Sequence, residues 1–214
     1  MKQKSSDSHL IEIKNMSLQI GSAKLLNAIS FKIGTQEIVS LVGESGSGKS
    51  LTALSLLGLH PNKARIEADK IDFNGSDIQY LSSKDWQKIR GKSIGMIFQE
   101  PQSSLNPSMR CGKQLQEVLQ QHTSLSVKDQ KQEIIDVLNE VQLSDTKRIL
   151  KSYPHQLSGG QKQRIMIALA LLCKPKLLIA DEPTTALDVT VQKEIIQLLK
   201  SRQKKYQMGI LFID

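Results

Sequence analysis

The chain has 214 residues, 39% of them hydrophobic, and its formal net charge is +8 with an isoelectric point of about 9.4. A chain of this length buries a large core without disulfide or metal support; its cysteines, Cys111 and Cys173, fit no metal-ligand spacing and are expected to be free thiols. No apolar run is long enough to span a bilayer, and the first ten residues lack the apolar core of a signal peptide. The lysines are scattered and only 4% of the residues are aromatic, which favours a solvated basic surface over a nucleic-acid site.

The first predicted elements are strands. LIEIKNMSLQI at residues 10–20 and AISFKI at residues 28–33 alternate apolar and polar side chains, so we expect two half-buried strands that pair antiparallel. EIVSLVG at residues 37–43 is a denser apolar run and is predicted to be a buried strand. A Gly/Ser loop follows it, and SLTALSLLGL at residues 50–59 then shows a helical pattern that ends near Gly58.

Three later apolar runs are also predicted to be buried strands: SIGMIFQ at residues 93–99, KLLIAD at 176–181 and GILFI at 209–213. Apolar strands that alternate with helices indicate a parallel sheet covered on both faces. Between the first two runs the pattern changes, and residues 126–141 and 161–172 have helical spacing. We therefore expect a core lobe of residues 1–100 and 173–214, interrupted by a helical subdomain of residues 101–172.

GESGSGKS at residues 43–50 matches the phosphate-loop pattern G-x-x-x-x-G-K-[ST]. Glycines allow successive backbone N–H groups to converge on phosphate oxygens, and the following helix adds its free N–H groups. Lys49 is expected to reach the β- and γ-phosphates, and the Ser50 hydroxyl to ligate Mg²⁺. The alternative is a flexible Gly/Ser turn, but a strand before and a helix after favour nucleotide binding. The predicted ATP-binding residues here are Gly43, Glu44, Ser45, Gly46, Ser47, Gly48, Lys49, Ser50 and Leu51.

LLIADEP at residues 177–183 places two acids at the tip of a predicted buried strand. Asp181 is expected to hold Mg²⁺ through water, as strand-end aspartates do in P-loop ATPases. Glu182 would then polarise the attacking water as general base. The alternative, a strand cap or surface turn before Pro183, leaves the neighbouring phosphate loop without a metal partner.

LSGGQ at residues 157–161 opens a helix of its own and resembles the signature loop of ATP-binding cassette (ABC) proteins. A helix-capping turn explains Ser158 alone. The resemblance implies a head-to-tail dimer in which two ATP molecules lie between the phosphate loop of one cassette and the signature loop of the other. The residues that it assigns to the partner's nucleotide are Leu157, Ser158, Gly159, Gly160 and Gln161.

The resemblance extends over nearly the whole chain and implies further roles. Gln99 resembles the Q-loop glutamine, which contacts Mg²⁺ and the attacking water, and Glu182 resembles the catalytic glutamate. Asp188 resembles the D-loop aspartate, which also acts across the dimer. The family places an aromatic residue before the phosphate loop to stack on adenine, and this chain has Ile20 there. The implied fold class is α/β, a P-loop NTPase core with a mostly parallel sheet, N-terminal antiparallel strands and an inserted helical subdomain.

The segments at residues 96–107, 152–171 and 181–192 are similar to the peptide/nickel branch of bacterial ABC importers. This resemblance implies an ATPase that energises uptake of peptides, nickel or related solutes. Its partners would be a second cassette, identical or paralogous, integral membrane permease subunits and, through them, a solute-binding receptor. Nucleic acid is not an expected partner, and the expected location is the cytoplasmic face of the inner membrane. The solute itself stays open.

The family continues after its last core strand with a switch histidine that contacts the γ-phosphate, whereas here Ile213 is followed directly by Asp214. No histidine of the chain takes that place; the four are His9, His60, His122 and His155. We therefore expect a C-terminally incomplete cassette over residues 1–214. One alternative is a cassette that binds ATP but hydrolyses it poorly. Another alternative is a cassette ATPase that acts on ribosomes or DNA. Such proteins usually carry two cassettes or a long coiled-coil insert, and neither is visible in this sequence.

Overall fold

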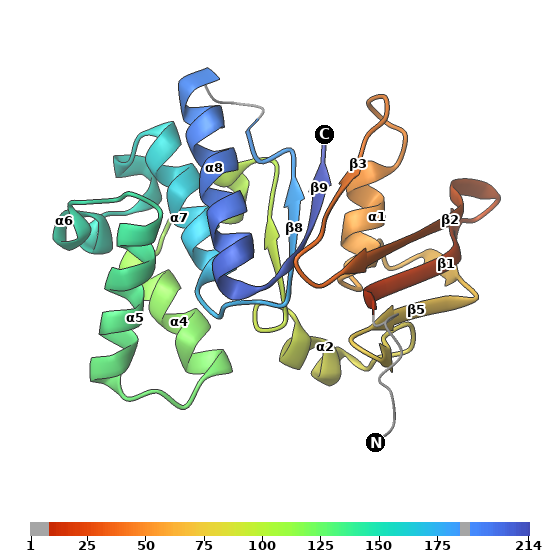
Figure 1. Ribbon diagram of the computed structural model, residues 1–214, viewed down its shortest axis with the longest axis horizontal. Coiled ribbons are helices and arrows are strands. Elements are labelled where there is room, and N and C mark those ends of the chain that lie inside the picture. Colours follow the sequence, from red (N-terminus) through yellow and green to blue (C-terminus); the bar gives the residue numbers. More distant parts are fainter. Residues whose placement is uncertain (1–8, 185–188) are drawn as a thin grey trace.

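A four-stranded parallel sheet separates two hydrophobic cores in the computed structural model, which describes residues 9–184 and 189–214 (Figure 1). Its strand order is β3-β9-β8-β7. The strands are β3 (Ile38–Leu41), β7 (Ile94–Ile97), β8 (Leu177–Asp181) and β9 (Gly209–Ile213). Successive residues of β8 serve the two cores in turn, Leu178 and Ala180 one, Leu177 and Ile179 the other. The predicted parallel sheet with two covered faces is confirmed.

The N-terminal strands form a second, antiparallel sheet, as predicted. Its order is β2-β1-β5-β6, and β4 also pairs with β1. Ile13 lies opposite Phe31 on one side and Ile71 on the other, and it faces the core. The strands are β1 (His9–Ile20), β2 (Ala23–Gly34), β4 (Ala64–Glu67), β5 (Lys70–Phe73) and β6 (Ser76–Asp77).

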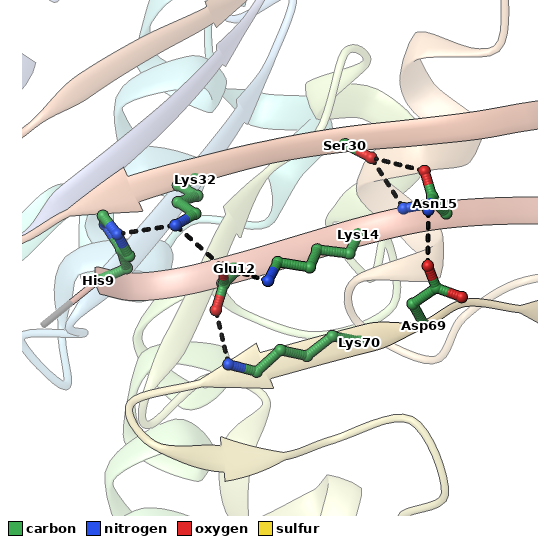
Figure 2. Close-up of polar contacts among 8 residues, drawn as sticks. All are labelled: His9, Glu12, Lys14, Asn15, Ser30, Lys32, Asp69 and Lys70. Atoms are coloured by element: carbon green, nitrogen blue, oxygen red, sulfur yellow. Dashed lines mark hydrogen bonds and ion pairs between the residues drawn. The ribbon is translucent and has the colours of Figure 1, made fainter. Parts of the chain in front are cut away.

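A charged cluster centres on Glu12 of β1 (Figure 2). Its carboxylate lies 2.6 Å from Nζ of Lys70, 3.0 Å from Nζ of Lys32 and 3.4 Å from Nζ of Lys14, and His9 contacts Lys32. The hydrogen bonds from Lys70 and Lys32 lower the pKa of Glu12 to about 2. The lysines explain how a carboxylate that is only 8% exposed is accommodated on this strand.

Helices cover both faces of the parallel sheet (Figure 1). On one face, α4, α5, α7 and α8 share a core with the sheet; α1 lies on the other, with α2 in the same core. The helices are α1 (Lys49–Ser55), α2 (Ser83–Ile89), α3 (Pro101–Ser104), α4 (Cys111–His122), α5 (Val127–Glu140), α6 (Thr146–Lys151), the 3₁₀ turn η1 (Pro154–Gln156), α7 (Gly159–Leu171) and α8 (Val189–Tyr206). Residues 101–172 are therefore mainly helical, with short loops between the helices, and the division of the chain into two subdomains remains a prediction.

Two predicted elements differ from the structure. The helix after the phosphate loop ends at Ser55, because Gly58 adopts a left-handed φ of 60° in the turn that follows. In the described part of the structure, β3 is the outermost strand of the parallel sheet, and Ile38 is exposed although the apolar run predicted a buried strand. Among the described residues, no helix has the length and apolar character needed to cross a bilayer.

Candidate functional site

The loop at residues 43–48 connects β3 to α1, as the phosphate-loop pattern predicts. Gly46 and Gly48 have φ values of 80° and 93°, in the left-handed region that favours glycine. A Cβ at position 48 would lie 2.5 Å from Cδ2 of Leu26, so the loop passes directly over the antiparallel sheet. A Cβ at position 46 would meet open space. Glycine at 48 is thus required by both conformation and packing.

Lys49 is the first residue of α1, and its side chain reaches back into this loop. Its Nζ donates hydrogen bonds to the carbonyl oxygens of Gly43 at 2.6 Å and Glu44 at 3.0 Å. The backbone N–H of Ser47 also bonds the Glu44 carbonyl, at 3.1 Å, which tightens the turn around the ammonium group. The loop therefore presents one positive charge at the start of α1, whose first turn also contains Ser50 and Leu51.

Ser50 and Asp181 meet although they lie far apart in the sequence. The Ser50 hydroxyl donates to Oδ1 of Asp181 at 3.1 Å, because α1 packs against β8. The Asp181 residue is only 5% exposed. Burial raises its pKa; the Ser50 hydrogen bond opposes this rise, the charge of Glu182 adds to it, and Lys49 opposes it. A buried carboxylate beside a hydroxyl, with its charge only partly compensated, is a suitable environment for a divalent cation.

Gln99 and Glu182 face each other at the ends of neighbouring parallel strands. Gln99 lies just beyond β7 and Glu182 just beyond β8, and the carboxyl ends of parallel strands meet at one edge of the sheet. Nε2 of Gln99 donates to Oε2 of Glu182 at 2.6 Å. The structure therefore gathers Lys49, Ser50, Gln99, Asp181 and Glu182 at this edge.

The LSGGQ segment begins α7. The Ser158 hydroxyl accepts from the backbone N–H of Gln161 at 3.3 Å, and Oε1 of Gln161 accepts from the N–H of Ser158 at 3.2 Å. This is a capping box. A Cβ on Gly159 or Gly160 would meet nothing within 4 Å, and a pocket of about 300 Å³ lies beside Ser158 and Gly160. Leu157 is buried beneath them. The glycines leave an open surface that the packing of the chain itself does not require.

The remaining predicted site residues are less informative. Ile20 ends β1, opposite Ala23 of β2 and Ala64 of β4, and is partly buried against the N-terminal core. Its role toward adenine stays a prediction. Asp188 lies outside the described residues. Both cysteines are free thiols, as predicted.

Two glutamines that the sequence analysis did not single out also approach this edge. Nε2 of Gln163, on α7, donates to the carbonyl of Pro183, and Nε2 of Gln192, on α8, donates to the carbonyl of Thr184 at 3.0 Å. Both acceptors lie immediately after Glu182. A glutamine within a helix gives no local signal of such a contact, because its acceptor belongs to a distant segment.

Comparison with known proteins places these features in a family. The sequence profile described as "ABC transporter" matches residues 26–185. The chain is 44% identical over 208 residues to the dipeptide transport ATP-binding protein DppD of Escherichia coli K12, covering 95% of the chain and 64% of DppD. It is 44% identical over 211 residues to the oligopeptide transport ATP-binding protein AppD of Bacillus subtilis 168, covering 96% of the chain and 64% of AppD. The chain thus spans less than two thirds of these relatives.

A solved structure shares the fold. The dimeric post-hydrolysis state of the ATP-binding cassette MJ0796 bound to ADP and Pi aligns with a TM-score of 0.81 at 27% identity. The alignment covers 95% of this chain and 87% of MJ0796. The family profile covers more than half of the chain, and its match includes the phosphate loop, the signature loop and both strand-end acids. The chain therefore belongs to the ABC transporter family.

Proposed function

We propose that the chain binds and hydrolyses ATP to energise an ABC importer, with peptides as the favoured solute class. The observation that carries this proposal is the gathering of Lys49, Ser50, Gln99, Asp181 and Glu182 at one edge of the sheet. The peptide assignment is supported by the printed roles of DppD and AppD in dipeptide and oligopeptide transport. Nickel and related solutes, which the sequence resemblance also implies, remain alternatives.

The residues fit Mg²⁺ and ATP. Ser50 and Asp181, already in contact at 3.1 Å, would hold the metal with Gln99 beside them, and a dication would offset the burial that raises the pKa of Asp181. Mg²⁺ supplies charge neutralisation for the phosphates when bound. Lys49 would exchange its bonds to the loop carbonyls for bonds to phosphate oxygens, and the loop N–H groups would bind the remaining oxygens.

Glu182 is the residue placed to accept the proton of the attacking water. Its carboxylate accepts a hydrogen bond from the amide of Gln99 at 2.6 Å, which orients it at the end of β8. Gln99 has a second amide atom, its oxygen, with which it can orient the same water. Hydrolysis then depends mainly on position and charge, as is usual for phosphoryl transfer.

The signature loop is proposed to serve a second cassette. Helix α7 packs on the face of the sheet opposite α1, and the surface of Gly159 and Gly160 is open. Ser158 and Gly160, together with Leu157 and Gln161, would bind the nucleotide of a head-to-tail partner, and MJ0796 forms a dimer in its ADP- and Pi-bound state. The partner cassette is this chain or a paralogue. Permease subunits in the inner membrane, and through them a solute receptor, complete the proposed assembly.

Glu182→Gln tests the assignment. We expect turnover of Mg-ATP to fall about 10²–10⁴-fold, because the general base is lost, while ATP binding is retained. Glu133→Gln is the control: this residue pairs at the surface with Lys174 at 3.0 Å, outside the site, and its loss should leave turnover unchanged. Equal turnover in the wild type and Glu182→Gln would contradict the proposal. Co-purification with ribosomes in place of an integral membrane protein would overturn the transport role.

A further inference from the structure

The turn that follows β8 is held by three other elements at three successive residues. The backbone N–H of Glu182 donates to the carbonyl of Ile213 on β9 at 3.0 Å. The carbonyl of Pro183 accepts from Gln163 on α7, and the carbonyl of Thr184 accepts from Gln192 on α8 at 3.0 Å. Three successive backbone groups of this turn are thus each bonded to a different element of the fold.

The anchoring holds an unfavourable backbone conformation. Glu182 has a φ of 42°, in the left-handed region that disfavours residues with a Cβ. The next residue is a proline, which biases its predecessor toward extended conformations. A conformation of this kind persists only where the surroundings impose it, and such positions cluster at functional sites. The direction of the Glu182 side chain therefore depends on the groups that hold the turn.

Gln163 is well placed to hold the backbone of Glu182 in this conformation. The residue is only 3% exposed, and its amide donates to Pro183, the residue immediately after Glu182. Because proline has no N–H, the carbonyl is the only backbone polar group at that position. A shift of this carbonyl moves Pro183, which is bonded directly to Glu182, and so displaces the carboxylate that Gln99 contacts at 2.6 Å.

We propose that Gln163 is a positioning residue for Glu182. It acts through the backbone, by holding the Pro183 carbonyl so that the carboxylate of Glu182 stays at the end of β8. Gln163 belongs to α7, the helix capped by Ser158, so one rigid element connects the signature loop to the turn that carries the general base. The inference rests on the proposed function of Glu182.

The test is Gln163→Met, which keeps the length of the side chain and removes the donor. Gln130→Met is the matched control: Gln130 is 6% exposed, and its Nε2 donates to the carbonyl of Leu125 at 3.0 Å on α5, away from the site. For Gln163→Met, kcat for Mg-ATP should fall roughly 10- to 100-fold, since a displacement of about 1 Å has an effect of this size. Its KM and its nucleotide dissociation constant should change less than about twofold. Gln130→Met should change none of the three.

A second readout needs no turnover. In the chain without nucleotide, amide hydrogen exchange at Glu182 should be faster in Gln163→Met than in the wild type and Gln130→Met, because the turn loses one of its anchors. Equal exchange and equal kcat in the two variants would overturn the inference alone. A wild type no more active than Glu182→Gln would overturn the proposed function and the kinetic part of the inference, and the exchange data would still decide whether Gln163 holds the turn.

A second substitution at position 163 tests the inference if Gln163→Met does not fold. Gln163→Glu keeps the volume and places a carboxylate oxygen against the Pro183 carbonyl, so it should show the same loss of kcat. If both variants at position 163 lose the folded state, by urea unfolding, while Gln130→Met keeps it, Gln163 has a structural role and the inference is wrong. If either variant folds and keeps the wild-type kcat, the inference is equally overturned.

Discussion

Substitution of Gly48 by alanine should damage the phosphate loop through two separable effects. The first is conformational: at a φ of 93°, a residue with a Cβ is destabilised by roughly 1–2 kcal/mol. The second is steric: the new Cβ would lie 2.5 Å from Cδ2 of the buried Leu26, and overpacking of this kind costs about 1–3 kcal/mol. The free energy of unfolding should therefore fall by about 2–5 kcal/mol in total.

Gly46→Ala isolates the first effect. Its φ of 80° is similar, but a Cβ there meets nothing within 4 Å, so only about 1–2 kcal/mol should be lost. Urea unfolding of both variants, with equal m-values, measures the difference. A double-mutant cycle adds Leu26→Ala: in that background Gly48→Ala should lose its steric part and cost about 1–2 kcal/mol. Equal costs for Gly46→Ala and Gly48→Ala, or a Gly48 effect that Leu26→Ala leaves unchanged, would refute this reasoning.

Two further predictions concern ionisable groups. Because the pKa of Glu12 is lowered from 4.5 to about 2 in the folded chain, its ionised form stabilises the fold fully above pH 4.5, and this contribution is lost as the pH falls toward 2. The difference in unfolding free energy between wild type and Glu12→Gln should therefore shrink below pH 4.5, and a constant difference would contradict the role of the three lysines. Burial and the hydrogen bond to Glu140 raise the pKa of Tyr206, so in an absorbance titration its phenol should ionise above the usual tyrosine range. Tyr206→Phe should remove this high-pH ionisation and lower the free energy of unfolding by about 1–2 kcal/mol; an unchanged titration would contradict the assignment.

Much of the fold was predictable from local patterns. The alternating runs gave β1 and β2, and the apolar runs gave the four parallel strands, because burial on one face or on both leaves a direct mark in the sequence. The phosphate loop at residues 43–48 was equally predictable, since its glycines are required by backbone conformation at Gly46 and Gly48. Asp181 and Glu182 stood out as acids at the end of an apolar strand.

The features that local patterns did not predict depend on which segments become neighbours in the fold. An apolar run does not tell whether its strand lies at the centre or the edge of a sheet, so Ile38 was expected to be buried and is exposed. The same limit applies to side-chain contacts. The hydrogen bond from Gln163 to Pro183, and the contacts of Lys32 and Lys70 with Glu12, join residues from different elements. Such pairs leave no periodic signal, because each residue alone is an ordinary member of its helix or strand.

The central place of β9 determines the order in which the sheet can assemble. In the described part of the sheet, β3 pairs with β9 and with no other strand, and residues 38–41 align with residues 210–213. Strands β7 and β8, in contrast, pair with each other and do not need β9 for this pairing. Bringing β3 and β9 together closes a loop that contains all the residues between them. This closure has an entropic cost before any contact compensates for it, which slows folding. During synthesis, the strand that leads into the phosphate loop is made early but joins its sheet only after β9 has left the ribosome. The phosphate loop therefore remains without its sheet partner, and open to proteolysis, until the residues of β9 have been made.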